Sequence, residues 1–342
     1  ACGLLLSPAS AQTTATTDPV GAMTVTLEAF DGTAKGTNFV SIPLLPAEAD
    51  ISGVKVGVIT SVGPSSITVS NAGWTPGELS NESNPYLAKI MTGLNEGLVL
   101  PIKTSPGSEN TAETIYVDTS VGFVSFDLTT LDIQTGVNGD EIQLFSAPTL
   151  LSVFGTPTTT GIAGGTSFAD ADTILVFDGI WRNYFYNSTR EEWVQSTFGF
   201  PSADNLVLHP YSAVLFERFA DTDLELMVSG RVPMTPRLVP FASGGVTTLS
   251  NGWPVGTTLE QLGLEDLPGW ISGGSALNAD SVLIKSGNGP WRIYFYDGSD
   301  WRESTFGFPL ANQTALPAGG GVLVDRNGQA DFVDLLDQSL PY

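Results

Sequence analysis

The chain has 342 residues, of which 42% are hydrophobic and 14% charged, and its 36 acidic and 13 basic residues give a formal charge of −23. The hydrophobic content excludes an intrinsically disordered chain, and the negative charge excludes nucleic acid as a partner because phosphates would repel it. With one histidine and one cysteine, the chain also lacks the ligands for a zinc or thiolate centre.

The first residues have the features of the end of a secretory signal. Leu4 to Leu6 is apolar, and Ala9 to Ala11 forms a small-x-small cleavage site. We therefore expect residues 1–11 to be a signal-peptide remnant and the mature protein to be secreted, either extracellular or at the cell surface. Two alternatives stay open, namely a lipid anchor on Cys2 and a coincidental match. No apolar run reaches the roughly 18 residues of a transmembrane helix.

Residues 12–21 are polar and rich in threonine, which predicts an extended N-terminal tail. In the next segment Met23, Val25 and Leu27 alternate with polar residues, and this period of two predicts a half-buried strand. Short β-branched runs then alternate with Gly, Pro, Asn and Asp clusters as far as the C-terminus. The pattern predicts an all-β fold of sandwich-like or barrel-like units.

Helical signals are few in this sequence. The best are 147–155 and 257–270, where Thr258 can cap a helix and Gly263 can end it. Each segment supports only one or two helical turns.

An internal repeat organises the rest of the chain. WRNYFYNSTREEWVQSTFGFP begins at Trp181, and WRIYFYDGSDWRESTFGFP begins at Trp291. Further along, Arg218 and Arg326 end matching segments 108 residues apart (326 − 218). We interpret this as one duplicated β unit.

The repeat also indicates an insertion. TTLSNGWPV stands almost directly before TTLEQLGL in the second copy, whereas about a hundred residues separate TNFVSIPLL from TLLSVFG in the first. We expect a small inserted β domain in this interval. The predicted domains are the first repeat at 22–46 and 146–235, the inserted domain at 47–145 and the second repeat at 236–342.

Several short motifs occur in a fixed order: DPVG, NFVSIPL, PYLAKIMTGLNEGL, ADAD followed by an apolar run and DG-x-W, and LGLEDLPGW. In these motifs the chain resembles a family of exported proteins of unknown function found in Verrucomicrobia and their relatives. The resemblance covers most of the chain from Asp18 onward. It implies an exported, β-rich protein and defines no catalytic residues. The repeated STFGFP departs from the family pattern.

The sequence offers little catalytic equipment. The only histidine, His209, stands where a strand breaks at a proline, and no G-x-S-x-G elbow or phosphate-binding loop is present. We expect no enzymatic activity and no cofactor. Calcium is the one open option, in loops that lack the twelve-residue spacing of an EF-hand. The aspartates in question are Asp170, Asp172 and Asp178, and Asp297 with Asp300.

The aromatic repeat supplies the candidate contact surface. In a strand, WRNYFY and WRIYFY each place one arginine and two tyrosines on one face. These residues are Arg182, Tyr184 and Tyr186, and Arg292, Tyr294 and Tyr296. Three interpretations stay open: packing inside the chain, self-association, and a glycan-binding platform. STFGFP is expected to be a loop that plugs the sheet end.

We therefore predict an exported, non-enzymatic structural or cell-surface protein that assembles with copies of itself into a filament or layer. In one version of this prediction, the N-terminal strand pairs with a neighbouring copy. The alternative is a carbohydrate-binding surface module that uses the duplicated aromatic faces. A hydrolase that depends on paired carboxylates is the third hypothesis.

Overall fold

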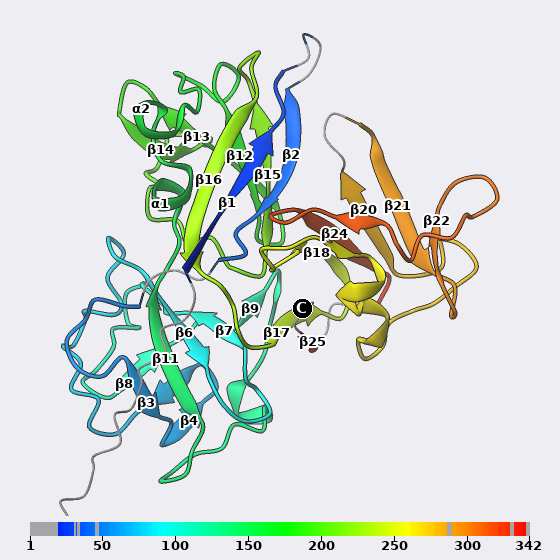
Figure 1. Ribbon diagram of the computed structural model, residues 1–342. Helices are drawn as coiled ribbons and strands as arrows, with labels where there is room; N and C mark the ends of the chain where they lie inside the picture. The colour runs from blue at the N-terminus through cyan, green and yellow to red at the C-terminus, as the bar shows by residue number, and fades with distance from the viewer. Residues whose placement is uncertain are drawn as a thin grey trace, which may run out of the picture.

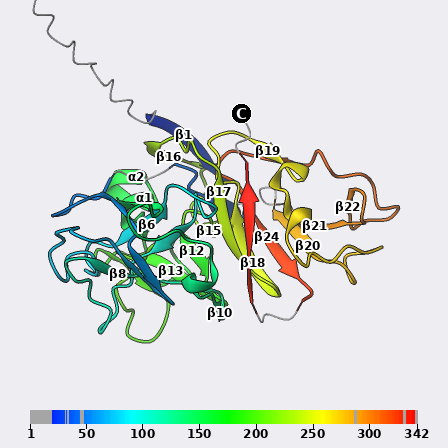
Figure 2. The same cartoon turned by 90° about the horizontal axis from the view of Figure 1, so that it is seen from below.

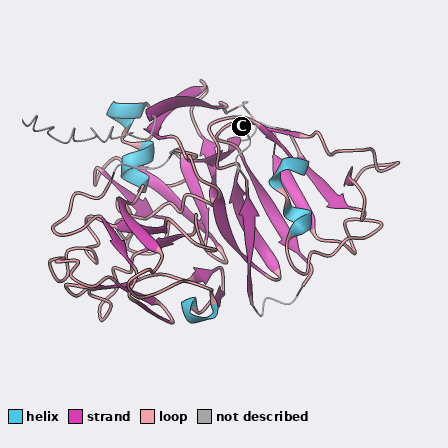
Figure 3. Cartoon of the chain, turned by 60° about the horizontal axis from the view of Figure 1, so that its bottom comes forward, coloured by secondary structure: helices cyan, strands magenta, loops and turns pink. Residues whose placement is uncertain are grey.

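The computed structural model describes residues 20–30, 32, 35–44, 48–285, 289–328 and 332–339. Strands make up 41% of the structure and helices 6%, which confirms the all-β prediction. Figure 3 shows strands in all parts of the molecule and only a few short helices. The predicted signal remnant and almost all of the predicted tail lie outside the described residues.

The first repeat consists of a five-stranded antiparallel sheet covered by a two-stranded ribbon. The sheet order is β14-β13-β12-β15-β2, and the ribbon pairs β1 with β16. Figure 1 shows the ribbon crossing in front of the sheet. The strands are β1 (Val20–Leu27), β2 (Gly36–Ser41), β12 (Thr173–Phe177), β13 (Trp181–Asn187), β14 (Glu192–Gln195), β15 (Ala213–Arg218) and β16 (Leu224–Arg231).

Alternating side chains determine how this ribbon packs. In β1, Met23, Val25 and Leu27 face inward and the residues between them are exposed, as the sequence predicts. The strand begins at Val20, so the last two residues of the predicted tail belong to it. β1 pairs with β16 of its own chain, where Leu224, Leu226 and Val228 contribute to the same core. In this structure the N-terminal strand therefore pairs within its own chain.

Two short helices, α1 (Leu150–Phe154) and α2 (Pro157–Thr160), close one end of the first repeat. The Thr149 hydroxyl accepts a hydrogen bond from the Ser152 amide, and Ser152 Oγ accepts one from the Thr149 amide. This capping box starts α1 where the sequence predicts a helix.

The second repeat has the same connections as the first. Its sheet order, β18-β24-β20-β21-β22, matches the first sheet strand for strand, and β17 and β25 form the covering ribbon. The 257–270 segment forms the short strand β19 and two 3-10 turns, η2 and η3, and Gly263 ends η2 in the left-handed conformation. The elements are β17 (Arg237–Ala242), β18 (Gly245–Ser250), β19 (Thr257–Thr258), η2 (Glu260–Leu262), η3 (Leu264–Asp266), β20 (Ser281–Lys285), β21 (Trp291–Tyr296), β22 (Trp301–Glu303), β23 (Ala315–Leu316), β24 (Gly321–Arg326) and β25 (Val333–Gln338).

The segment between β2 and α1 forms sheets of its own around a separate core that includes Trp74 and Tyr86. Its main sheet has the order β3-β11-β6-β7, and a second sheet has the order β4-β5-β8. The elements are β3 (Val56–Val58), β4 (Ser61–Gly63), β5 (Ser66–Thr68), β6 (Tyr86–Ile90), β7 (Val99–Pro101), β8 (Thr114–Tyr116), β9 (Ser120–Val121), β10 (Val124–Ser125), η1 (Leu128–Thr130) and β11 (Glu141–Ser146).

The two repeats contact each other reciprocally. The Ser41 amide at the end of β2 donates to Gly319 O at 2.8 Å, and the Ser250 amide at the end of β18 donates to Tyr211 O at 2.8 Å. Gly319 and Tyr211 occupy equivalent places in the two copies (319 − 211 = 108). The same exchange of contacts defines a two-fold interface between identical subunits. Figure 2 shows β15, β18 and β24 close together where the repeats meet.

The tryptophans that open the repeated motif pack at this junction. Trp181 and Trp291 lie against a small cluster formed by Phe39, Ala213 and Leu215. The rings of Phe39 and Trp291 meet edge to face, with centroids 5.9 Å apart. One face of the repeated hairpin therefore holds the two copies together within the chain.

Candidate functional site

The structure corrects the predicted contact surface. Tyr184, Tyr186 and Tyr294 are only 5%, 8% and 3% exposed. They pack in the cores beneath the ribbons, and burial raises the pKa of both Tyr184 and Tyr294. The alternation predicted for the strand is right, but the tyrosine face points into the repeat because the covering ribbon lies on that side. These three tyrosines are therefore not available to a partner.

The other three predicted residues lie nearer the surface. Arg182 pairs with Asp178 at 2.7 Å, and Arg292 lies 3.4 Å from Glu303 with 58% of its side chain exposed. Tyr296 is half-buried and tilts against Trp301, with ring centroids 5.8 Å apart. The six residues thus do not form one surface.

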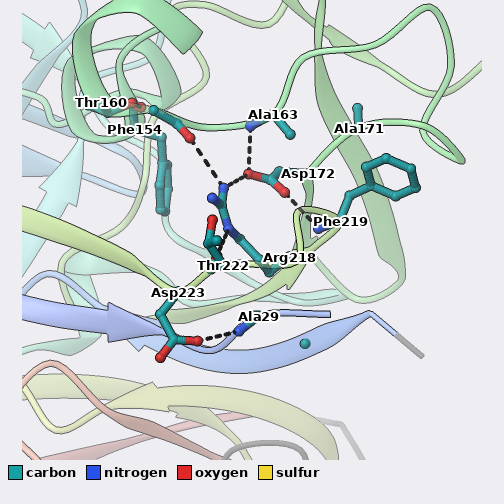
Figure 4. Close-up of polar contacts among 12 residues, drawn as sticks. Ala29, Phe154, Thr160, Ala163, Ala171, Asp172, Arg218, Phe219, Thr222 and Asp223 are labelled. Carbon is teal, nitrogen blue, oxygen red and sulfur yellow. Dashed lines mark hydrogen bonds and ion pairs between the residues drawn. The ribbon is translucent and has the colours of Figure 1, made fainter. Parts of the chain in front are cut away.

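A buried ion pair lies beneath the first ribbon (Figure 4). The Asp172 carboxylate accepts hydrogen bonds from the amides of Ala163 and Phe219 at 2.8 and 2.7 Å, and from the Arg218 guanidinium at 2.5 Å. Arg218 also donates to carbonyl oxygens of the chain segments around it, including Thr222 O at 3.0 Å. This pair joins the loop before β12 to the end of β15.

The second repeat has the same arrangement 108 residues later (280 − 172). Asp280 accepts from the amides of Ile271 and Asn327 at 3.0 and 2.7 Å, and Arg326 lies 3.4 Å from it. Arg326 also pairs with Asp334 of β25 at 2.7 Å. Sequence reasoning noted both arginines but missed their partners, although the shared spacing of the aspartates was visible.

The other aspartates considered for calcium also have protein partners. Hydrogen bonds from Ser167 lower the pKa of Asp170 to about 2, and Asp297 and Asp300 both pair with Arg302. In the described part of the chain, no group of three or more His, Cys, Asp or Glu side chains is placed to hold a metal ion. Calcium binding at these loops stays an untested prediction.

His209 and Tyr211 tie the inserted segment to the first repeat. His209 Nδ1 accepts from the Tyr211 amide, so Nε2 carries the proton and donates to Val99 O at 3.3 Å. The Tyr211 hydroxyl donates to Gly97 O. Burial lowers the pKa of His209 to about 4, which keeps the ring neutral at pH 7. The histidine thus has a structural role at this junction.

A groove of about 1030 Å³ opens where the inserted segment meets both repeats. Lys103, Asp118 and Phe126 line it from the inserted segment, Phe177 and Asn205 line it from the first repeat, and β18 closes a further side. The groove is thus lined by aromatic rings and by side chains of both charges. A groove of this size accommodates a bulky side chain or a small ligand.

The two STFGFP loops have the same backbone structure. Gly199 and Phe200 have φ values of 86° and 48°, and Gly307 and Phe308 have values of 85° and 44°. The turn is closed by the Phe200 amide donating to Thr197 O and by the matching bond from Phe308 to Thr305 O. A positive φ at a phenylalanine is rare and costs energy. The surrounding structure therefore imposes this turn on both copies.

Each loop packs one ring against the sheet and leaves the other in solvent. Phe200 packs edge to face on Phe185, and Phe308 packs on Phe295, with centroids 5.7 and 5.4 Å apart. These rings cover part of one face of the sheet, whereas the sequence predicts a loop that plugs the sheet end. Phe198 and Phe306 are each 106% exposed. Sequence reasoning missed this because the exposed ring and the packed ring of each loop belong to the same short apolar motif.

Comparison with protein-family models, curated proteins and solved structures found no match to this chain. The family resemblance inferred from its motifs therefore stays a prediction. None of the described helices has the length and apolar character needed to cross a membrane.

Proposed function

We propose that this is an exported, non-enzymatic structural protein of the cell surface that assembles with copies of itself. The observation that supports this proposal is the pair of fully exposed rings, Phe198 and Phe306, each held on an ordered loop of the same backbone structure. Transfer of a phenylalanine ring from water to a protein pocket contributes about 1.5–3 kcal/mol. Each chain therefore carries two equivalent rings for docking on another copy.

The groove supports a second copy as the partner. Its walls include the rings of Phe126 and Phe177, and its volume of about 1030 Å³ can accept a phenylalanine from another molecule. The loops and the groove are different surfaces of one chain, so contact between them is heterologous. Heterologous contacts that do not close into a ring generate filaments.

The overall charge adds a condition to this assembly. Copies with a formal charge of −23 repel one another, and salt screens such repulsion over about 10 Å at 0.1 M. We expect assembly to strengthen as sodium chloride rises from low to moderate concentration.

The experiment compares particle size by light scattering and negative-stain microscopy for the full chain and four variants. Phe198→Ser combined with Phe306→Ser should abolish assembly, and each single change should weaken it. Val137→Ser removes an equally exposed side chain, 97% exposed, from the inserted segment and should leave assembly intact. A double variant that assembles like the wild type contradicts the proposal.

A substitution in the groove tests whether the groove is the docking site for the exposed phenylalanines. Asn205 is exposed and lines the groove, so Asn205→Trp should narrow it without disturbing a core, and assembly should fall. Normal assembly of this variant would exclude the groove as the docking site.

The groove also supports the second candidate function, carbohydrate binding. Phe126 and Phe177 supply rings for sugar faces, and Asp118 and Asn205 supply polar groups for hydroxyls. The buried tyrosines no longer support this function. Glycan-array binding that survives the double phenylalanine change but is lost in Asn205→Trp would favour it over assembly.

A further inference from the structure

A buried arginine lies at the point where the two repeats and the inserted segment meet. Arg237 begins β17 and is 5% exposed. Its Nη1 donates to Ser250 Oγ at 3.3 Å, whereas its Nε and Nη2 have no hydrogen-bond partner among the residues that the structure describes. Buried donors without an acceptor are rare in native proteins, because each costs the free energy of its lost hydration.

The positive charge of Arg237 also lacks a carboxylate. None of the ion pairs among the described residues includes it. Burial lowers the pKa of Arg237 to about 10, so the guanidinium is still charged at pH 7. The rings of Tyr211 and Trp253 lie 4.8 and 5.3 Å from its Cζ, and their faces offset part of the cost of burying the charge.

The site is built to hold this side chain. Gly252 has a φ of 70°, and a Cβ at that position would lie 0.8 Å from Arg237 Nη1. Only a glycine therefore leaves room for the guanidinium. Gln338, the cross-strand neighbour of Arg237, donates its amide to Leu262 O at 3.0 Å and does not line the adjoining cavity.

A small cavity of about 10 Å³ adjoins Arg237. Lys89 and Thr235 also line it, with the Lys89 ammonium donating to Thr235 Oγ1 at 2.8 Å. A cavity of this size holds a single water-sized particle, which excludes phosphate, sulfate and carboxylate ligands. A water molecule would accept hydrogen bonds from Arg237 but leave its buried charge uncompensated, whereas a monatomic anion would accept the hydrogen bonds and also compensate the charge.

We propose that this cavity is a halide site, occupied by chloride, in which Arg237 Nε and Nη2 are the donors and Lys89 adds positive charge. The cavity is lined by Leu44 after β2, by Lys89 of the inserted segment and by Gly252 of the second repeat. A chloride there would join the three parts of the chain. This proposal is independent of the assembly proposal.

The first test measures unfolding of the full chain by urea in sodium chloride and in sodium gluconate at equal ionic strength. A ligand that binds only the folded state shifts the folding equilibrium by its occupancy. Raising chloride from ten to a hundred times its Kd should therefore raise the folding constant about tenfold, with no such rise in gluconate. Equal stability in the two salts would overturn the proposal.

Two variants and a structural measurement complete the test. Arg237→Met should abolish the difference between the salts, whereas Arg292→Met, at an exposed arginine, should preserve it. If Arg237→Met fails to fold, crystals of the wild type grown in bromide decide the question. An anomalous peak within hydrogen-bonding distance of Arg237 is the expected result, and a water or an empty cavity there would refute the site.

Discussion

Replacement of Arg218 by methionine is the most direct test of how the repeat is held together. The side chains of Arg218 and Asp172 are 4% and 0% exposed, so water does not replace the lost guanidinium. Asp172 would keep its hydrogen bonds from the amides of Ala163 and Phe219 but would lose its counter-charge. The Thr222 carbonyl oxygen would also lose its donor.

The expected loss is large because the charge stays buried. Removal of one partner of a buried ion pair costs about 3–5 kcal/mol, and we expect about 4 kcal/mol for Arg218→Met. Combining it with Asp172→Asn should recover part of this loss, because asparagine is neutral and still accepts one amide hydrogen bond. Arg302→Met is the matched control, since Arg302 pairs with Asp297 near the surface, with 27% of each side chain exposed. It should cost no more than about 1 kcal/mol.

The assay is urea-induced unfolding at pH 7, in which the free energy of unfolding and its dependence on urea are fitted for each variant. A loss below about 1 kcal/mol for Arg218→Met at an unchanged urea dependence would refute the reasoning. So would a double variant less stable than Arg218→Met alone.

Three further predictions follow from burial and close packing. The pKa of His209 is lowered to about 4 in the folded protein, from about 6.5 in the unfolded chain. As pH falls from 6.5 to 4, the unfolded chain therefore gains the proton first, and up to about 3 kcal/mol of stability is lost. His209→Gln should flatten the pH dependence of the urea midpoint. Gly321→Ala would place a Cβ 2.3 Å from the Ala213 side chain at the junction of the repeats. Calorimetry should therefore show a destabilisation of about 1–3 kcal/mol. An unchanged melting temperature would contradict this packing. Tyr184→Ala and Tyr294→Ala should each cost about 3–5 kcal/mol as core truncations, measured by urea unfolding, and wild-type stability would show that these rings are not core.

Much of the fold was predictable because it rests on local patterns. The alternation in β1 and the short helix α1 are decided by neighbouring residues, and both appear where the sequence places them. The repeat was equally predictable, since the spacing of Arg218 and Arg326 is a property of the sequence and does not depend on how the chain folds between them. The candidate contact surface failed for a different reason. A period of two separates the faces of a strand, but it does not tell which face the rest of the chain will cover.

The sequence by itself determined an all-β chain with a duplicated hairpin, whose strand faces alternate between tyrosine and tryptophan. Only the tertiary structure decided where those faces lie. The ribbon of β1 and β16 buries Tyr184, Trp181 packs in the cluster where the repeats meet, and Phe198 is left in solvent. These outcomes depend on contacts between residues far apart in the chain, such as Arg237 with Tyr211 and Trp253. Local periodicity carries no information about such contacts, because they arise only when separate elements pack.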